Sequence, residues 1–398
     1  MVTGLAVASL VQFGATIACA ASTASTTSTA TTSTATTSTA TSTATATPAA
    51  RSLVAIGAPG AQRVVVLDCA SGEPVASGVL PAALSAEVAL APDGGALYVA
   101  TRERDLLRLS LPGLREQARA PTPFEVFRLA VAGGADAIVL AGGRGDGALS
   151  ARDPDTLAEL QRYRLPAPFA VSAIRDTPAR RRFAVAFADL DEAWEIAYDR
   201  NAPPVLQGLV HDYRSNEAVP LPGRLTPRRF ALPDATRALY AGPAAYELAR
   251  VDASGVLGVV HLDVRRQIER PATAGTVLPG RIAAWRDGAR RGWLIAAPGA
   301  SDAQVLEAGS WRVTGRVDAR GEILALAASG DRVLVVHATR GGVVVSPVDA
   351  ATGALLAPLG RLGSPPVPLR VVAGSGDCVA LLDRDERWLA GFVAPPLR

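Results

Sequence analysis

Histidine is the side chain best suited to ligate a metal or move a proton near neutral pH, and this chain has three of them. His211 lies in a polar, loop-like stretch, His337 ends an apolar run just before a Gly-Gly pair, and His261 sits inside an apolar run. Spacing therefore makes His211 and His337 candidates for a ligand site. We expect His261 to be a satisfied structural residue.

Several common kinds of active site are excluded by residue spacing. The histidines and the three cysteines are too scattered for a zinc site, and no Cys-x-x-Cys-His segment is present for covalent haem attachment. The glycines of 142–147 lack the Lys-Ser or Lys-Thr of a phosphate loop and predict a turn. No Gly-x-Ser-x-Gly nucleophile elbow occurs. Any site must therefore be assembled from loop residues distant in the sequence.

The charge balance excludes two classes of partner. All 40 basic residues are arginine, and against 37 acidic residues they leave a net charge of only +3. This excess is too small to indicate nucleic acid or an anionic membrane surface as a partner. With 49% hydrophobic residues, the 398-residue chain is long and apolar enough for a large folded core.

The first 50 residues contain no charged side chain and read as export and tether segments. Residues 1–20 resemble a secretory signal, with cleavage after Ala20 or lipid attachment at Cys19 as alternatives. Residues 21–50 are almost pure Ser, Thr and Ala, which predicts a disordered linker. We therefore expect an exported protein, membrane-associated only through a lipidated Cys19. In an oxidising compartment Cys69 and Cys378 could pair.

From residue 51 to 398 the sequence predicts an all-β domain. Short runs of Val, Ile, Leu and Ala alternate with Gly, Pro and Asp clusters. One strand-then-turn element recurs about every 43 residues, which is the period of a β-propeller blade. Its copies end at Asp68, Ser110, Asp153, Asp199, Asp263, Glu307 and Asp349.

The repeat predicts a propeller of eight blades, the first and last incomplete, with seven blades as the alternative. The one long interval indicates an insertion between Asn201 and Leu225. Propellers bind ligands through the loops between blades and the loops between second and third strands. These loops lie on one face of a propeller. The insertion, which contains His211, is expected to follow the last strand of its blade, so we expect His211 to lie on this ligand-binding face.

Residues around the insertion resemble a known family. The segments 192–204, 208–214 and 217–218 are similar to the haem d1 biosynthesis protein NirF, a relative of NirN and of the d1 domain of cytochrome cd1 nitrite reductase. Weaker similarity extends to 262–266 and 309–313. The resemblance implies a periplasmic propeller that binds haem d1 or its dihydro precursor and assists late steps of haem d1 biosynthesis for denitrification. It leaves open a carrier role or an oxidoreductase-like step, and implies partners among haem d1 maturation proteins or nitrite reductase.

The resemblance also implies roles for particular residues. His211 is expected to act as haem-iron ligand or acid/base, with Asp212 and Tyr213 at the macrocycle. Tetrapyrrole carboxylates are best held by arginine, whose planar fork makes paired bonds. The expected cofactor-binding residues in the resembling segment are His211, Asp212, Tyr213 and Arg214. Position alone adds the loop arginines Arg102 and Arg228 and, without a family motif, His337, with Arg104, Arg144 and Arg229 as further loop arginines.

Two histidines that the family usually carries are absent. The corresponding stretches here are 84–87, with sequence Leu-Ser-Ala-Glu, and 275–279, with Val277 at the histidine position. This absence keeps an alternative hypothesis open. The chain would then be a non-catalytic protein-interaction propeller that has lost the haem pocket.

Overall fold

The computed structural model divides the chain into two units, Met1–Ala49 and Ala50–Arg398. It describes residues 52–57, 59–69, 71–86, 88–164, 169–207, 219–278, 280–329, 331–350, 352–363, 370–373, 378–382 and 388–393. Within these ranges, no helix is long and apolar enough to cross a membrane.

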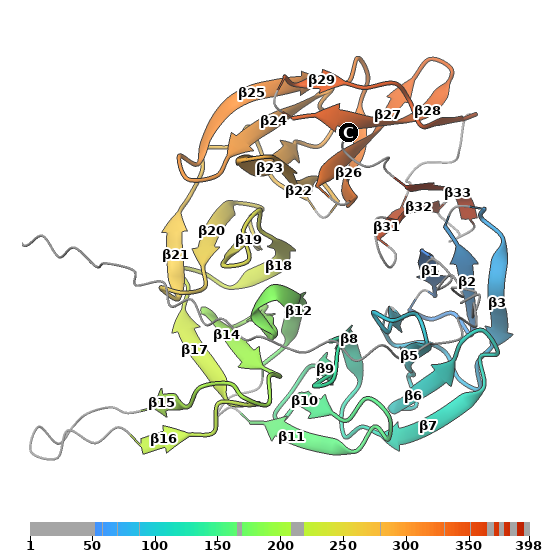
Figure 1. Cartoon of the computed structure of the whole chain (residues 1–398), viewed down its shortest axis with the longest axis vertical. Coiled ribbons are helices and arrows are strands. Elements are labelled where there is room, and N and C mark those ends of the chain that lie inside the picture. Colours follow the sequence, from blue (N-terminus) through green and yellow to red (C-terminus); the bar gives the residue numbers. More distant parts are fainter. Residues whose placement is uncertain are drawn as a thin grey trace, which may run out of the picture. The chain divides into compact units, whose positions relative to one another are not determined.

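Apart from a two-stranded hairpin described below, the described strands of the second unit form eight antiparallel sheets around a central axis (Figure 1). The first sheet contains β1 (Leu53–Ile56), β2 (Arg63–Asp68) and β3 (Pro74–Val79), and the second contains β4 (Ala89–Leu90), β5 (Ala96–Ala100), β6 (Asp105–Ser110) and β7 (Glu116–Pro121). The third contains β8 (Val126–Val131), β9 (Val139–Gly143), β10 (Leu149–Arg152) and β11 (Glu159–Tyr163). The fourth contains β12 (Val171–Thr177), β13 (Arg182–Phe187), β14 (Glu192–Ala197) and β17 (Pro227–Ala231).

The remaining four sheets continue in chain order. The fifth contains β18 (Thr236–Ala241), β19 (Glu247–Asp252), β20 (Leu257–His261) and β21 (Arg266–Glu269), and the sixth contains β22 (Ile282–Asp287), β23 (Arg290–Ala296), β24 (Asp302–Glu307) and β25 (Arg312–Asp318). The seventh contains β26 (Ile323–Ser329), β27 (Arg332–Thr339), β28 (Gly342–Asp349), β29 (Ala354–Leu355) and β30 (Gly360–Leu362). The eighth contains β31 (Arg370–Ala373), β32 (Cys378–Leu382) and β33 (Trp388–Val393), and a short 3-10 helix, η1 (Pro178–Arg180), joins β12 to β13.

The predicted all-β propeller is confirmed, and among the described residues the first and last sheets have three strands each. The recurring sequence element ends at or within two residues of β2, β6, β10, β14, β20, β24 and β28. From the second to the seventh sheet this is the third strand of each. The repeat of the strand-then-turn element in the sequence therefore corresponds to one blade of the propeller.

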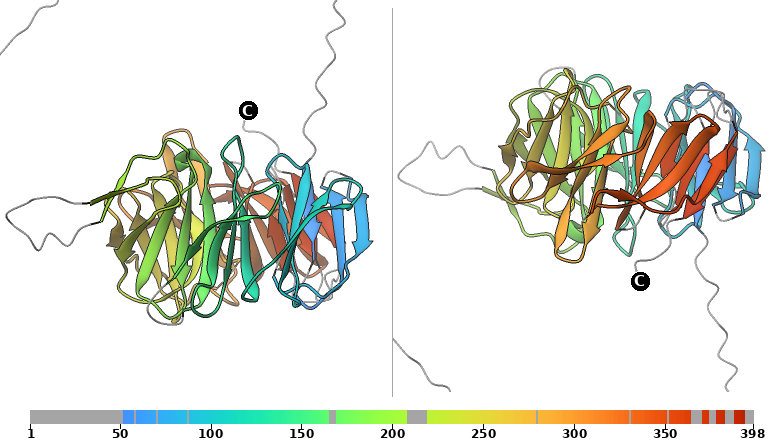
Figure 2. Two further views of the ribbon diagram at one scale, coloured as in Figure 1. Left: turned by 90° about the horizontal axis from the view of Figure 1, so that it is seen from below. Right: turned by 90° about the horizontal axis from the view of Figure 1, so that it is seen from above.

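The hydrophobic pattern of each strand matches its position in the blade, from the innermost strand at the axis to the outermost strand at the rim. The middle strands β5 and β9 are buried at every position because a neighbouring sheet covers each of their faces. The outer strand β7, with sequence EQARAP, is mostly exposed, and its charged side chains point to water. Figure 2 shows the sheets edge-on, standing side by side around the axis.

Aromatic side chains fill the space between the third and fourth sheets. The Trp194 ring is 2% exposed and meets the Phe187 ring edge-on at 5.0 Å between centroids. The Arg229 guanidinium lies 5.3 Å from the centre of the Trp194 ring. Trp194 is therefore a packing residue, as its place in an apolar strand predicts.

The insertion forms a hairpin of β15 (Val205–Gln207) and β16 (Val219–Leu221), and it joins β14 to β17. It thus connects the third strand of its sheet to the fourth, so the expectation that it follows the last strand is wrong. The sequence could not distinguish these cases, because β17 reads as the start of the next repeat. His211, Asp212, Tyr213 and Arg214 lie outside the described residues.

The ring closes between the first and eighth sheets. Val54, Ile56 and Leu67 pack with Ala380 and Leu382 of β32. Cys69, which follows β2, is disulfide-bonded. Its Sγ lies 3.9 Å from the carbonyl oxygens of Val379 and Phe392, in β32 and β33. The disulfide of Cys69 therefore lies at the seam where the first and eighth sheets meet.

We expect this bond to join Cys69 to Cys378, the other cysteine of the propeller unit. A link between positions so distant in the chain limits the unfolded ensemble, so Cys69→Ser should lower the free energy of unfolding by about 2–4 kcal/mol. Chemical denaturation with and without dithiothreitol measures this. Reduction should lower the stability of the wild type to that of the variant and leave the variant unchanged. Peptide mapping that finds Cys378 as a free thiol would contradict the pairing.

Candidate functional site

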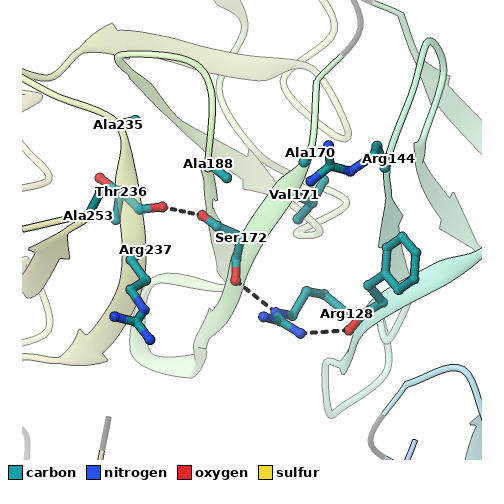
Figure 3. Close-up of a pocket in the computed structure, with 11 residues that line it drawn as sticks. Arg128, Arg144, Ala170, Val171, Ser172, Ala188, Ala235, Thr236, Arg237 and Ala253 are labelled. Atoms are coloured by element: carbon teal, nitrogen blue, oxygen red, sulfur yellow. Dashed lines mark hydrogen bonds between the residues drawn. The ribbon is translucent and has the colours of Figure 1, made fainter. Parts of the chain in front are cut away.

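A pocket of about 620 Å³ lies at the propeller axis, where the third, fourth and fifth sheets meet. We call it the axial pocket. Its walls are the first residues of the innermost strands β8, β12 and β18 and the loops that join second to third strands in the same sheets (Figure 3). It is lined by Phe127, Arg128, Arg144, Ala170, Val171, Ser172, Ala188, Ala235, Thr236, Arg237 and Ala253.

Local backbone geometry brings the Arg144 loop to the axis. A bridge pairs Arg144 with Ala170, and the Gly145 amide donates to the Phe169 carbonyl at 2.7 Å. A Cβ added at Gly143 would lie 2.2 Å from the carbonyl oxygen of Glu125. Only glycine allows that approach, so Gly143 sets this loop against the start of β8.

Three arginines give the axial pocket its charge. Arg128 is held by its Nε donating to the Ser172 carbonyl at 2.7 Å and by a second bond to the Phe127 carbonyl at 2.9 Å. The side chains of Arg144 and Arg237 are exposed and make no hydrogen bond or ion pair within the described parts of the chain. No Asp or Glu is among the described lining residues. The described lining therefore carries positive charge and no carboxylate.

The floor of the pocket adds hydrogen-bonding groups. The Ser172 hydroxyl donates to the carbonyl oxygen of Thr236. The Thr236 residue is fully buried, and its Oγ1 has no partner among the described residues. An unpartnered buried hydroxyl is costly unless a ligand or water completes it.

Small side chains shape the remaining surface. Four of the lining residues are alanines, and Val171 and Phe127 supply apolar contact. A flat, partly apolar molecule bearing carboxylates would match this surface, since guanidinium groups bind carboxylates through paired, charge-assisted bonds. Imidazole, thiol and thioether groups are missing from the described lining, and the described residues hold no group of three His, Cys, Asp or Glu suited to a metal.

The three predicted cofactor-binding residues that the structure describes, Arg102, Arg228 and His337, do not lie together. Arg102 is exposed in the loop between β5 and β6, where its amide donates to the Ala83 carbonyl at 2.8 Å. Arg228 lies on β17 at the outer edge of the fourth sheet and donates to the Pro203 carbonyl at 3.4 Å. His337 is buried in β27. None of the three is among the described residues that line the axial pocket.

Arg144 was predicted as a loop candidate, whereas Arg128 and Arg237 were not predicted from the sequence. Both lie near the start of the first strand of a blade, where most neighbours are apolar. A charged residue at that place is a signal, because the innermost strand borders the axis. His261 is satisfied: its Nδ1 accepts the Asp263 amide at 3.2 Å, and its ring stacks on Tyr246 at 4.7 Å.

Asp176 lies further along the inner strand β12, and the pKa of its carboxyl is shifted by its surroundings. Burial raises the pKa of its carboxyl to about 6, against the opposing effect of a hydrogen bond that the Tyr198 hydroxyl donates at 3.1 Å. The folded protein therefore binds this proton more tightly than the unfolded chain does.

We expect the stability of the wild type to fall as the pH rises from about 4 to about 6 relative to that of Asp176→Asn, because only the wild type must ionise a buried carboxyl. Urea denaturation at pH 4, 5, 6 and 7 gives the difference between the two proteins. Asp146→Asn, at an exposed carboxyl, controls for the loss of one charge. A difference that is constant from pH 4 to 7 would contradict the expectation.

Comparison with solved structures gives the fold a context. A structure of the dihydro-haem d1 dehydrogenase NirN in complex with DHE matches with a TM-score of 0.63 and 19% identity, over 86% of this chain and 73% of that chain. The fold resembles that of NirN. The crystal structure of BamB from Moraxella catarrhalis matches with a TM-score of 0.53 and 13% identity, over 85% of this chain and 90% of that chain.

The NirN match confirms the predicted resemblance at the level of the propeller fold. No protein-family model matches the sequence, and the search of curated protein sequences finds no significant match. The axial pocket and its arginines therefore carry the functional argument.

Proposed function

We propose that this protein is an exported propeller that binds a d1-type tetrapyrrole in the axial pocket and takes part in late steps of haem d1 biosynthesis. The observation that carries the proposal is the cluster of Arg128, Arg144 and Arg237 around a cavity without acidic lining residues in the described parts of the chain. Carboxylates of the macrocycle would neutralise these charges, and one carboxylate would accept a hydrogen bond from the Thr236 hydroxyl.

Two further observations support it. The propeller fold is shared with NirN, which was solved in complex with DHE and is named as a dihydro-haem d1 dehydrogenase. The disulfide at Cys69 suits an oxidising compartment, which agrees with the export predicted from residues 1–20.

The residues fit the carboxylates of a tetrapyrrole better than its iron. Haem iron takes His, Met, Cys or Tyr as axial ligand, and the described lining offers none. We therefore propose that the pocket binds the macrocycle by its periphery, as a substrate or cargo. His211 as iron ligand stays a prediction from the sequence.

We expect the purified, tetrapyrrole-free protein to bind haem d1 and its dihydro precursor with a saturable absorbance change. Removing one charge-assisted contact costs about 1.5–3 kcal/mol, so Arg144→Ser and Arg237→Ser should each raise the Kd about tenfold or more. Arg312→Ser, at an exposed arginine on the outer strand β25, is the matched control and should leave the Kd unchanged.

The outcomes separate the proposal from its rival. Absence of binding to either tetrapyrrole would overturn it and favour the interaction propeller without a haem pocket. Binding that is indifferent to both axial arginines would move the site elsewhere. In the same titration, His211→Ala tests the iron ligand: loss of the bound iron's spectral bands with unchanged affinity would assign His211 to the metal.

A further inference from the structure

A second pocket, of about 600 Å³, lies between the sixth and seventh sheets. We call it the rim pocket. Its walls are the end of β25, the following loop, and residues of β27, β28, β29 and β30. None of its lining residues belongs to the axial pocket, which the third to fifth sheets form.

The unusual group in the rim pocket is His337. The residue is 6% exposed, and neither Nδ1 nor Nε2 has a hydrogen-bond partner among the described residues. The backbone of Ala338 opposes part of the pKa shift that burial causes in the imidazole, but it does not meet the geometry of a hydrogen bond to either ring nitrogen. A buried imidazole with both nitrogens unsatisfied costs free energy, so such a group indicates a missing partner.

The protonation state of His337 defines what that partner must offer. Burial lowers the pKa of the His337 imidazole below its ordinary value. The ring is therefore neutral at pH 7, with one nitrogen as a donor and the other as an acceptor. A hydroxyl satisfies either nitrogen, whereas a carboxylate satisfies only the donor.

The charged groups around the rim pocket favour an anion. Arg316, Arg320 and Arg361 line it, against the single carboxylate of Asp318. Arg316 bonds Asp302 at 2.7 Å, and the Asp318 carboxylate accepts the Arg320 amide at 2.8 Å. The guanidinium groups of Arg320 and Arg361 make no ion pair with any described residue, which leaves them available to an anionic ligand.

Register places the polar groups on one face of the seventh sheet. His337 pairs with Val344 in the β27–β28 ladder, and Ser346 lies two residues further along β28 on the same face. Ser346 is 2% exposed and lines the rim pocket with His337. Imidazole and hydroxyl thus lie deep in the cavity, and the arginines lie on exposed residues near its mouth.

We propose that the rim pocket is a second ligand site, which binds a small organic hydroxy acid: its carboxylate pairs with Arg320 and Arg361, and its hydroxyl bonds the buried imidazole of His337. The exposed guanidinium groups thereby gain an anionic partner, and the buried imidazole gains a hydrogen-bonding partner.

Nuclear magnetic resonance of histidine-labelled protein tests this directly, because the whole chain has only three histidines. The His211→Asn and His261→Asn variants assign the His337 signal by elimination. We expect L-malate to shift the His337 ring resonances saturably and to leave those of His261 unchanged. An unchanged His337 signal at saturating malate, or a shift shared by all three histidines, would overturn the proposal.

Calorimetric titrations identify the groups responsible. Succinate, which lacks the hydroxyl, should bind at least tenfold more weakly than malate, because it leaves the imidazole unpaired. Arg361→Ser should weaken malate binding at least tenfold, whereas Arg237→Ser in the axial pocket should not change it. Equal binding of malate and succinate, or malate binding indifferent to Arg361→Ser, would contradict the assignment. Stronger binding of inorganic phosphate than of malate would also overturn the hydroxy-acid class.

Discussion

Packing on both faces of each sheet is the constraint on which the whole propeller depends. Middle strands such as β5, β9 and β13 are buried on both sides because each sheet lies between two neighbours. No sheet is complete without the next, so the ring must close for any blade to bury its apolar surface. The seam between the first and eighth sheets, with three described strands each, is where this condition is hardest to meet, and a disulfide at Cys69 lies there.

The same constraint decides where chemistry can occur. Side chains between the sheets are buried in packing contacts and do not reach a ligand, as in the cluster around Trp194. Polar groups remain free at the starts of the innermost strands, in the loops beside them, and where two sheets separate at the rim. The axial pocket uses the first two places and the rim pocket uses the third. In both, arginines without carboxylate partners among the described residues supply the charge, and a buried uncharged group, Thr236 or His337, supplies hydrogen bonding.

Much of the fold could be predicted from the sequence because strand pattern and blade period are local properties. The recurring element, which was found from local pattern alone, ends at or within two residues of the third strand in each of the second to seventh sheets. The site was harder, because it depends on which inner strands converge at the axis. Arg144 was found from its loop, but Arg128 and Arg237 were missed, since their importance comes from facing one another across sheets. Arg228 was predicted as a loop residue, but it lies on β17 at the outer edge of the fourth sheet.

The connection of the β15–β16 hairpin has a consequence for how the molecule can be approached. The hairpin leaves from the end of β14, where Arg200 beside it bonds Asp136 of the loop between β8 and β9. That loop joins a first strand to a second, so it belongs to the end of the propeller opposite the mouth of the axial pocket. A macromolecule that bound the base of the hairpin would leave the mouth of the axial pocket open. The topology thus allows the protein to be held from one side while a small molecule enters or departs on the other.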